Sequence, residues 1–188
     1  MDYQSILAHL NLRAVLPNLE ALVANDDQAA ALAKKKNICI RFRVCNGPDA
    51  YVKFEQGACR VGQGDPGRTD VLLFFTSCEH LNKMFDGQSN PIPLKKFTKI
   101  GFLTKEFQTL TDRLEYFLKP TESTGKDPDY MSLNTRLMMY TAGRAISVLC
   151  EGDPLAKAVA AGIPDGPVLM KVLPEGPAVS LDFRGGRA

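Results

Sequence analysis

The sequence has 188 residues, of which 45% are apolar and 23% charged, and 23 basic against 21 acidic side chains give a formal net charge of +2. This composition is typical of a globular protein with a buried core, and the balanced charge argues against the basic surface of a nucleic-acid-binding protein. No apolar run approaches the roughly 18 residues of a membrane-spanning helix, and the five cysteines form no C-x-x-C pair. We therefore expect a cytoplasmic protein with reduced thiols and no stable membrane insertion.

The chain begins with a helical region that gives way to an antiparallel meander. Apolar residues recur at helical spacing over 3–16 and again after Pro17. From Asn37 the period changes to two, and NICIRFRVCNG and AYVKFEQG alternate apolar and polar residues around the turn NGPD. The short strand ACRV follows. Short turns between alternating segments favour antiparallel pairing of these strands.

The stretch VGQGDPGR contains the spacing G-x-G-x-x-G at Gly62, Gly64 and Gly67. A dinucleotide-binding loop with this spacing must be followed by a helix, whose N–H groups hold the pyrophosphate. Here TDVLLFFTS follows, which reads as a strand, and Pro66 interrupts the turn. A turn between two strands explains the glycines better than a nucleotide site.

The next segment, DVLLFFT at 70–76, is apolar on both faces. A strand of this kind is buried on both sides, so we expect a second covering layer over it. A helix is predicted over 76–87, because Thr76 and Glu79 have the spacing of a capping box.

Beyond this helix the elements become less regular. KKFTKIGFL at 95–103 reads as a further strand, and apolar spacing predicts a helix over 104–118. Residues 120–129 are polar and punctuated by Pro and Gly, which indicates a linker. The sequence thus divides into a domain at 1–119 and a C-terminal extension at 130–188, which consists of a long helix, a short helix and a β-hairpin.

The terminal hairpin resembles the first one. IRFRVCNGPDAYVKFEQG and LMKVLPEGPAVSLDFRGG share a strand, a Gly-Pro turn and a strand that ends in Phe before Gly, and both follow two helices. The extension therefore reads as a partial repeat of residues 1–57, although turn residues also recur by chance. A lone hairpin is marginal in water. It should extend the main sheet, cover the second face of 70–76, or pair with another chain.

Few residues suggest catalysis. The two histidines lack partners at metal-ligand spacing, and no nucleophile elbow is present, so we expect neither metal nor cofactor. Cys78 lies near a helix start, where a thiol pKa can fall, although we favour packing as the explanation of this cysteine. Arg41 and Arg43 alternate on one face of a strand and belong either to a solvated surface or to a clamp for an anionic head group.

The segment PGRTDVLLFFTSCEHLNKMFDGQSNP resembles the sterol carrier protein type two family. In that family a strand with an Asp leads to a capped helix, then to Gly and to Asn-Pro. The matching positions here are Asp70, Leu81, Gly87, Asn90 and Pro91. The resemblance covers about residues 1–120. It departs at Lys96-Phe97, where the family usually has a glycine, and the tail from 120 onward has no counterpart in the minimal family domain.

This resemblance implies an α+β fold, with a twisted, mainly antiparallel five-stranded sheet covered by helices, and an apolar tunnel between the layers. Such domains bind fatty acyl chains, sterols or related lipids without catalysis. The apolar side chains that agree with this function, with Met138 and Met139 as an adaptable lid, are Phe42, Leu73, Phe75, Leu81, Met84, Phe85, Ile100, Phe102, Phe107, Leu110, Leu114 and Met138. The same side chains would also serve as a close-packed core.

Two other functions stay open. The tail helix and hairpin would make the chain a homodimerisation module that supports a partner enzyme. An enzyme acting on an acyl substrate would need a nucleophile, for which Cys45, Cys59 and Cys78 are the candidates.

Overall fold

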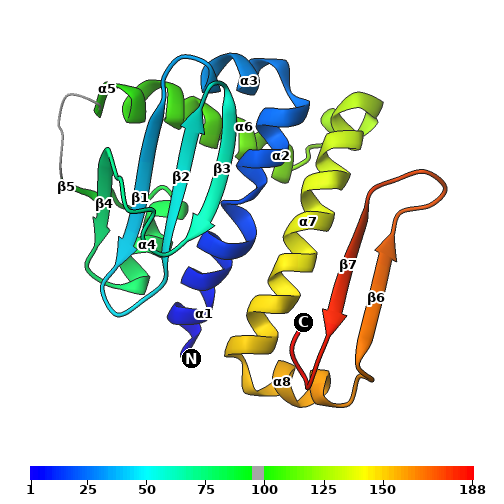
Figure 1. Ribbon diagram of the computed structural model, residues 1–188. Helices are drawn as coiled ribbons and strands as arrows, with labels where there is room; N and C mark the ends of the chain where they lie inside the picture. The colour runs from blue at the N-terminus through cyan, green and yellow to red at the C-terminus, as the bar shows by residue number, and fades with distance from the viewer. Residues whose placement is uncertain (95–99) are drawn as a thin grey trace.

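A five-stranded mixed sheet with helices on one face forms the first part of the molecule (Figure 1). The computed structural model describes residues 1–94 and 100–188. The strands of this sheet are β1 (Ile38–Val44), β2 (Asp49–Glu55), β3 (Ala58–Gln63), β4 (Val71–Phe75) and β5 (Ile92–Leu94). Their order is β3-β2-β1-β4-β5; the β1–β4 pair is parallel and the other pairs are antiparallel. The expected α+β class and the antiparallel meander over 38–63 are therefore confirmed.

The helices of this part precede β1, follow β5, or, in the case of α4, lie between β4 and β5 in the chain. They are α1 (Tyr3–Leu10), the π-helical turn η1 (Asn11–Val15), α2 (Asn18–Asn25), α3 (Asp27–Ala33), α4 (Cys78–Phe85), α5 (Ile100–Phe102), the π-helical turn η3 (Leu103–Phe107) and α6 (Gln108–Leu118). Helix α4 begins one residue later than expected, because the Ser77 hydroxyl, and not that of Thr76, accepts the His80 N–H. The strand expected over 95–103 is wrong where it can be checked: Ile100–Leu103 is helical, and 95–99 lies outside the described residues.

The glycine-rich stretch connects β3 to β4. Gly64 and Gly67 both have φ +76, a left-handed conformation that glycine adopts without strain. The chain then enters β4 and not a helix, so the interpretation as a turn is confirmed.

Among residues 1–94 and 100–188, no helix covers the outer face of strand β4. Its outward side chains are Leu72, which is only 8% exposed, and Phe74, which is half-buried. In the ladder, Leu72 lies between Arg41 of β1 and Leu94 of β5. The apolar outer face of β4 is thus flanked by side chains of neighbouring strands, and among the described residues the helices of this part lie on the opposite face (Figure 1). The expectation of a covering layer on both sides was wrong.

The long helix α7 (Pro128–Gly152) contacts both parts of the molecule. The 3₁₀ turn η4 (Thr124–Lys126) precedes it, in the segment expected to be a linker. Near its start, Tyr130, Leu133 and Leu137 belong to the same core as the sheet. Polar contacts fix this docking, since the Asn134 amide donates to the Phe117 carbonyl at 2.6 Å. The main core therefore continues beyond residues 120–129 into α7.

The C-terminal hairpin packs on the other side of α7 (Figure 1). It follows α8 (Pro154–Ala161) and consists of β6 (Gly166–Lys171) and β7 (Ala178–Phe183), which form a two-stranded sheet of their own. Leu181 and Phe183 of β7 form a small second core with Cys150 and Ala160. The hairpin thus neither extends the main sheet nor covers 70–76.

Candidate functional site

The largest apolar region lies between the main sheet and its helices. Alternation in β1, β2 and β4 directs one side chain of each pair inward, and these are fully or almost fully buried. Helices α4, α5 and α6 and the turn η3 supply the opposite wall, because their apolar side chains recur on one face. The side chains of this opposite wall are Leu81, Phe102, Phe107, Leu110 and Leu114.

Aromatic rings join the two walls. Phe42 of β1 lies 6.2 Å from the ring of Phe107 and 6.4 Å from that of Phe75, between ring centroids. Phe54 of β2 lies 5.7 Å from Phe102 and 6.3 Å from Phe107. These separations are those of favourable aromatic pairs. The rings meet directly, so a ligand here would have to separate the helical wall from the sheet.

Most of the expected ligand side chains gather in this region. Eight of them are buried in the main core: Phe42, Leu73, Phe75, Leu81, Phe102, Phe107, Leu110 and Leu114. Met84 and Phe85 of α4 are partly buried and pack against that core. The side chain of Ile100 lies outside the described residues.

The structure does not bring Met138 to this group. Its side chain is 48% exposed, and it does not belong to the main core, whereas its neighbour Leu137 is fully buried there. Conversely, Phe54 contacts two rings of the helical wall and was missing from the expected set. The alternation of Ala50, Val52 and Phe54 was the signal that could have identified it.

Asp70 and His80, two polar residues of the stretch PGRTDVLLFFTSCEHLNKMFDGQSNP, make hydrogen bonds at the edge of this apolar region. The Asp70 carboxylate accepts the Cys39 N–H at 3.0 Å and is 7% exposed, which anchors the start of β4 to β1. The Thr76 N–H donates to His80 Nδ1 at 3.2 Å, so the other ring nitrogen carries the proton and donates to the Asn90 carbonyl at 2.9 Å. The His80 ring also meets the Phe75 ring edge to face at 5.4 Å. Both residues therefore hold neighbouring segments together by hydrogen bonds at the boundary of the apolar region.

Arg41, on the outer face of the sheet, is occupied by carboxylates. Its Nε donates to both oxygens of Asp49, at 2.9 and 3.1 Å, and another nitrogen bonds Asp65. The hydrogen bonds to Asp49 raise the pKa of Arg41 above its usual range, so the guanidinium stays charged. An anionic head group would have to displace both acids, which does not favour an anion clamp built on Arg41.

Two of the candidate nucleophiles, Cys59 and Cys78, have thiol pKa values that their surroundings raise. Burial, and then the charge of Glu20, raises the pKa of the Cys59 thiol far above its ordinary value. Burial and the nearby Asp2 also raise the pKa of Cys78, although Cys78 is the first residue of α4. The alternative of a lowered pKa at Cys78 is therefore wrong, and the favoured interpretation, a packing role, agrees with its position against the main core. At neutral pH these thiols are in the protonated, weakly nucleophilic form.

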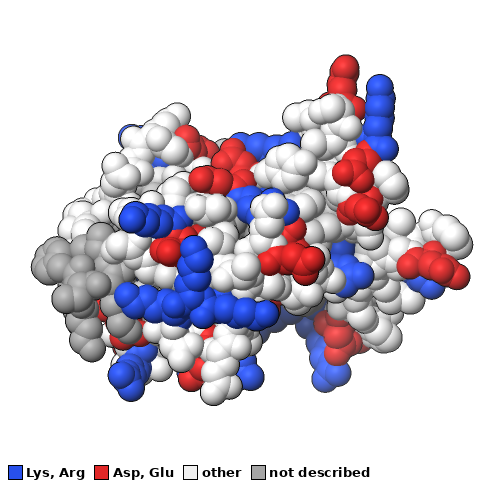
Figure 2. Space-filling view, turned by 90° about the horizontal axis from the view of Figure 1, so that it is seen from above, with Lys and Arg blue, Asp and Glu red and all other residues white. Residues whose placement is uncertain are grey.

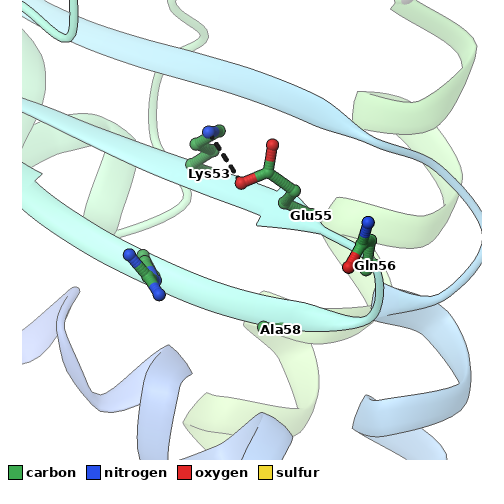
Figure 3. Close-up of a pocket in the computed structure, with 5 residues that line it drawn as sticks. Lys53, Glu55, Gln56 and Ala58 are labelled. Atoms are coloured by element: carbon green, nitrogen blue, oxygen red, sulfur yellow. Dashed lines mark hydrogen bonds and ion pairs between the residues drawn. The ribbon is translucent and has the colours of Figure 1, made fainter.

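Two polar hollows lie on the surface. One, of about 390 Å³, is lined by Lys53, Glu55, Gln56, Ala58 and Arg60 around the β2–β3 turn, and in it Lys53 pairs with Glu55 at 2.8 Å (Figure 3). The other, of about 420 Å³, lies at the end of α7 and is lined by Cys150, Glu151, Lys157, Ala161, Gly185, Gly186 and Arg187. Seen from above, basic side chains gather over the part that holds the main sheet, with acidic ones beside them (Figure 2). Both hollows are of mixed charge and separate from the apolar region.

Within residues 1–94 and 100–188, no three His, Cys, Asp or Glu side chains come together as a metal site would require. In the same described part of the chain, no helix has the length and hydropathy to cross a membrane. No protein-family model matches the sequence, and no curated protein matches it either.

Proposed function

We propose that this protein binds an apolar small molecule, such as a fatty acyl chain or a sterol-like lipid, between the main sheet and its helices, without chemistry of its own. The observation that supports this function is the convergence of the expected side chains, from strands and helices far apart in sequence, on two facing walls. The described strands of the main sheet, in which β1 and β4 form the single parallel pair, supply one of these walls.

The ligand would enter beside α4, where the helical wall is only partly buried. Met84 and Phe85 of α4 are partly buried there and pack against the core. Burying one ligand methylene is worth about 0.8 kcal/mol, so a chain of about eight to ten gains roughly 6–8 kcal/mol before the costs of association and of parting the rings. Because a micromolar dissociation constant corresponds to about 8 kcal/mol, a chain of this length would bind more weakly than micromolar once these costs are subtracted, and a longer acyl chain or a sterol would bind more tightly.

Native mass spectrometry of freshly purified protein, repeated after organic extraction, tests the proposal directly. The expected result is an added mass that matches a lipid and disappears on extraction. Protein that carries no adduct, and that also fails to take up oleate or cholesterol offered in excess, would contradict it.

Single-tryptophan variants locate the site, because the natural chain contains no Trp. Met84→Trp places the reporter at the margin of the apolar region, and Met138→Trp places it on the half-exposed face of α7 as a matched control. Added ligand should shift the emission of Met84→Trp and leave that of Met138→Trp unchanged. Equal responses from both variants would place binding elsewhere.

A second candidate function is an interaction module. It is favoured by the exposed apolar side chains of the C-terminal hairpin, among them Val168, Leu169 and Leu173. An acyl-substrate enzyme has less support, since burial raises the pKa of Cys59 and of Cys78.

A further inference from the structure

Strand β6 has one free edge. It pairs with β7 on one side only, and in Figure 1 it is the outermost strand of the hairpin, on the side away from α7. The corresponding hairpin of the main sheet, β1–β2, is different, because β4 pairs with β1 and β3 pairs with β2. Within the described residues, neither β6 nor β7 has a strand on its other side.

The free edge carries backbone groups ready to pair. The Val172 N–H donates to the Pro177 carbonyl at 3.0 Å, which fixes the alternation of the β6–β7 ladder. In an antiparallel ladder every second residue bonds to the same neighbour, so the backbone groups of Leu169 and Lys171 point to the free edge. Pro167 shares this edge and has no N–H, so it presents only a carbonyl.

The side chains of β6 leave this edge unprotected at its centre. Leu169 is 66% exposed on the outer face of the hairpin, and Val168 is 40% exposed on the face toward α7. Edge strands usually carry charges or bulges that prevent pairing, but the only charge on β6 is Lys171 at its end. Two strands alone are also marginally stable.

We propose that β6 pairs antiparallel with β6 of a second copy of this chain, about a two-fold axis at Leu169. In this register each Leu169 N–H donates to the Leu169 carbonyl of the other copy. Each Lys171 N–H meets the Pro167 carbonyl of the other copy, so the missing donor of Pro167 leaves no N–H unpaired. The two hairpins then form one continuous sheet with an isologous interface.

The side chains are complementary in the same register. On the face toward α7, Val168 lies opposite Met170 of the second copy, and each covers apolar surface of the other. On the outer face Leu169 meets its own counterpart. Lys171 extends across the small Pro167 of the second copy toward that copy's Asp182, which is the β7 partner of Pro167 on this face. Lys171 and Asp182 have opposite charges, which favours this alignment, and Asp182 would be shared between Lys171 and Arg184 of its own chain, with which it pairs at 2.6 Å.

Analytical ultracentrifugation over a concentration series tests the proposal with two lysine variants. Leu169→Lys places a charge at the centre of the interface, and Leu155→Lys changes an equally exposed leucine (74%) on α8 as a control. The expected result is a dimer whose dissociation constant rises about tenfold or more in Leu169→Lys, because each copy loses a buried leucine, and stays unchanged in Leu155→Lys. A protein that stays monomeric throughout would overturn the proposal, as would a dimer insensitive to Leu169→Lys.

Crosslinking tests the register itself. Directly opposed residues of a hydrogen-bonded antiparallel pair have Cα atoms about 5.5 Å apart, which a disulfide can span. In a background where the exposed Cys45 is replaced by Ser, Leu169→Cys should form a covalent dimer under mild oxidation and Leu155→Cys should not. Equal crosslinking of both variants, or of neither, would overturn the register.

Discussion

Gly143 of α7 reports whether the hairpin is seated on this helix as described. A Cβ at this position would lie 2.5 Å from Cγ1 of Val179 in β7, well inside the 3.4 Å at which ordinary contact begins. The obstructing atom belongs to a β-branched side chain, which has few alternative rotamers. Gly143→Ala therefore forces the hairpin and the helix apart, or forces Val179 out of its preferred conformation.

The expected effect is the difference of two opposing terms. Replacing a glycine within a helix by alanine ordinarily stabilises a protein by about 1 kcal/mol. Overpacking by one methyl group costs about 1–3 kcal/mol. Gly143→Ala should thus be destabilising by up to about 2 kcal/mol, and should not give the usual gain. In a Val179→Ala background the obstruction is gone, and the same substitution should stabilise by about 1 kcal/mol.

Urea unfolding of the four proteins in this double-mutant cycle measures both values, and a coupling free energy of about 1–3 kcal/mol between Gly143 and Val179 is expected. Gly152→Ala is a useful comparison in the same helix, because its Cβ would come too close only to the flexible end of Met1 and would make an ordinary 3.7 Å contact with Cγ1 of Ile6. If Gly143→Ala stabilises the protein equally with and without Val179, the two side chains do not meet and the placement of the hairpin on α7 is refuted.

Two further predictions concern pH. Burial and then the charge of Arg13 lower the pKa of His9, so the unfolded chain binds more protons below pH 6.5 and the free energy of unfolding should decrease as the pH falls through that region; His9→Gln should flatten this part of the profile. Burial raises the pKa of Asp26, but its hydrogen bonds to Arg113 and to the Ala29 N–H outweigh burial and the net pKa is lowered. The advantage of the natural protein over Asp26→Asn should therefore be complete above pH 3.8 and disappear as the pH falls further, and an advantage that persists in stronger acid would contradict this assignment.

The strands of the meander were predictable because their inward and outward environments differ. Ile38, Ile40 and Phe42 face the helices and their alternate neighbours do not, so the period of two is visible in the sequence. At β4 the sequence shows no alternation, and the covering layer expected from this pattern was wrong. In the part of the chain that the structure describes, its outer side chains Leu72 and Phe74 lie beside side chains of neighbouring strands and not under a helix, and shielding by either route selects the same apolar residues.

The other differences between the predictions and the structure arise where the local sequence is compatible with more than one structure. Thr76 and Ser77 are both good caps, and only the path of the chain decides that Ser77 bonds to His80. Met138 is adjacent to the fully buried Leu137, but a helix packed on two sides still leaves part of its surface exposed. The sequence predicted a long helix here, but it did not show which elements would lie against each side of α7.

Helix α7 has a consequence for the order in which the protein comes apart. One side of the helix is held by the extensive main core, and the other holds a second core of only a few buried side chains. A small core with few apolar contacts opens at low free energy, so β6, β7 and α8 can detach locally while the rest of the fold stays intact. The main core cannot unfold by itself while the C-terminal unit stays folded, because loss of the main core also removes the support of α7, against which the hairpin packs. The C-terminal unit therefore depends on the first part for its stability, even though the sequence of its hairpin resembles that of the first hairpin.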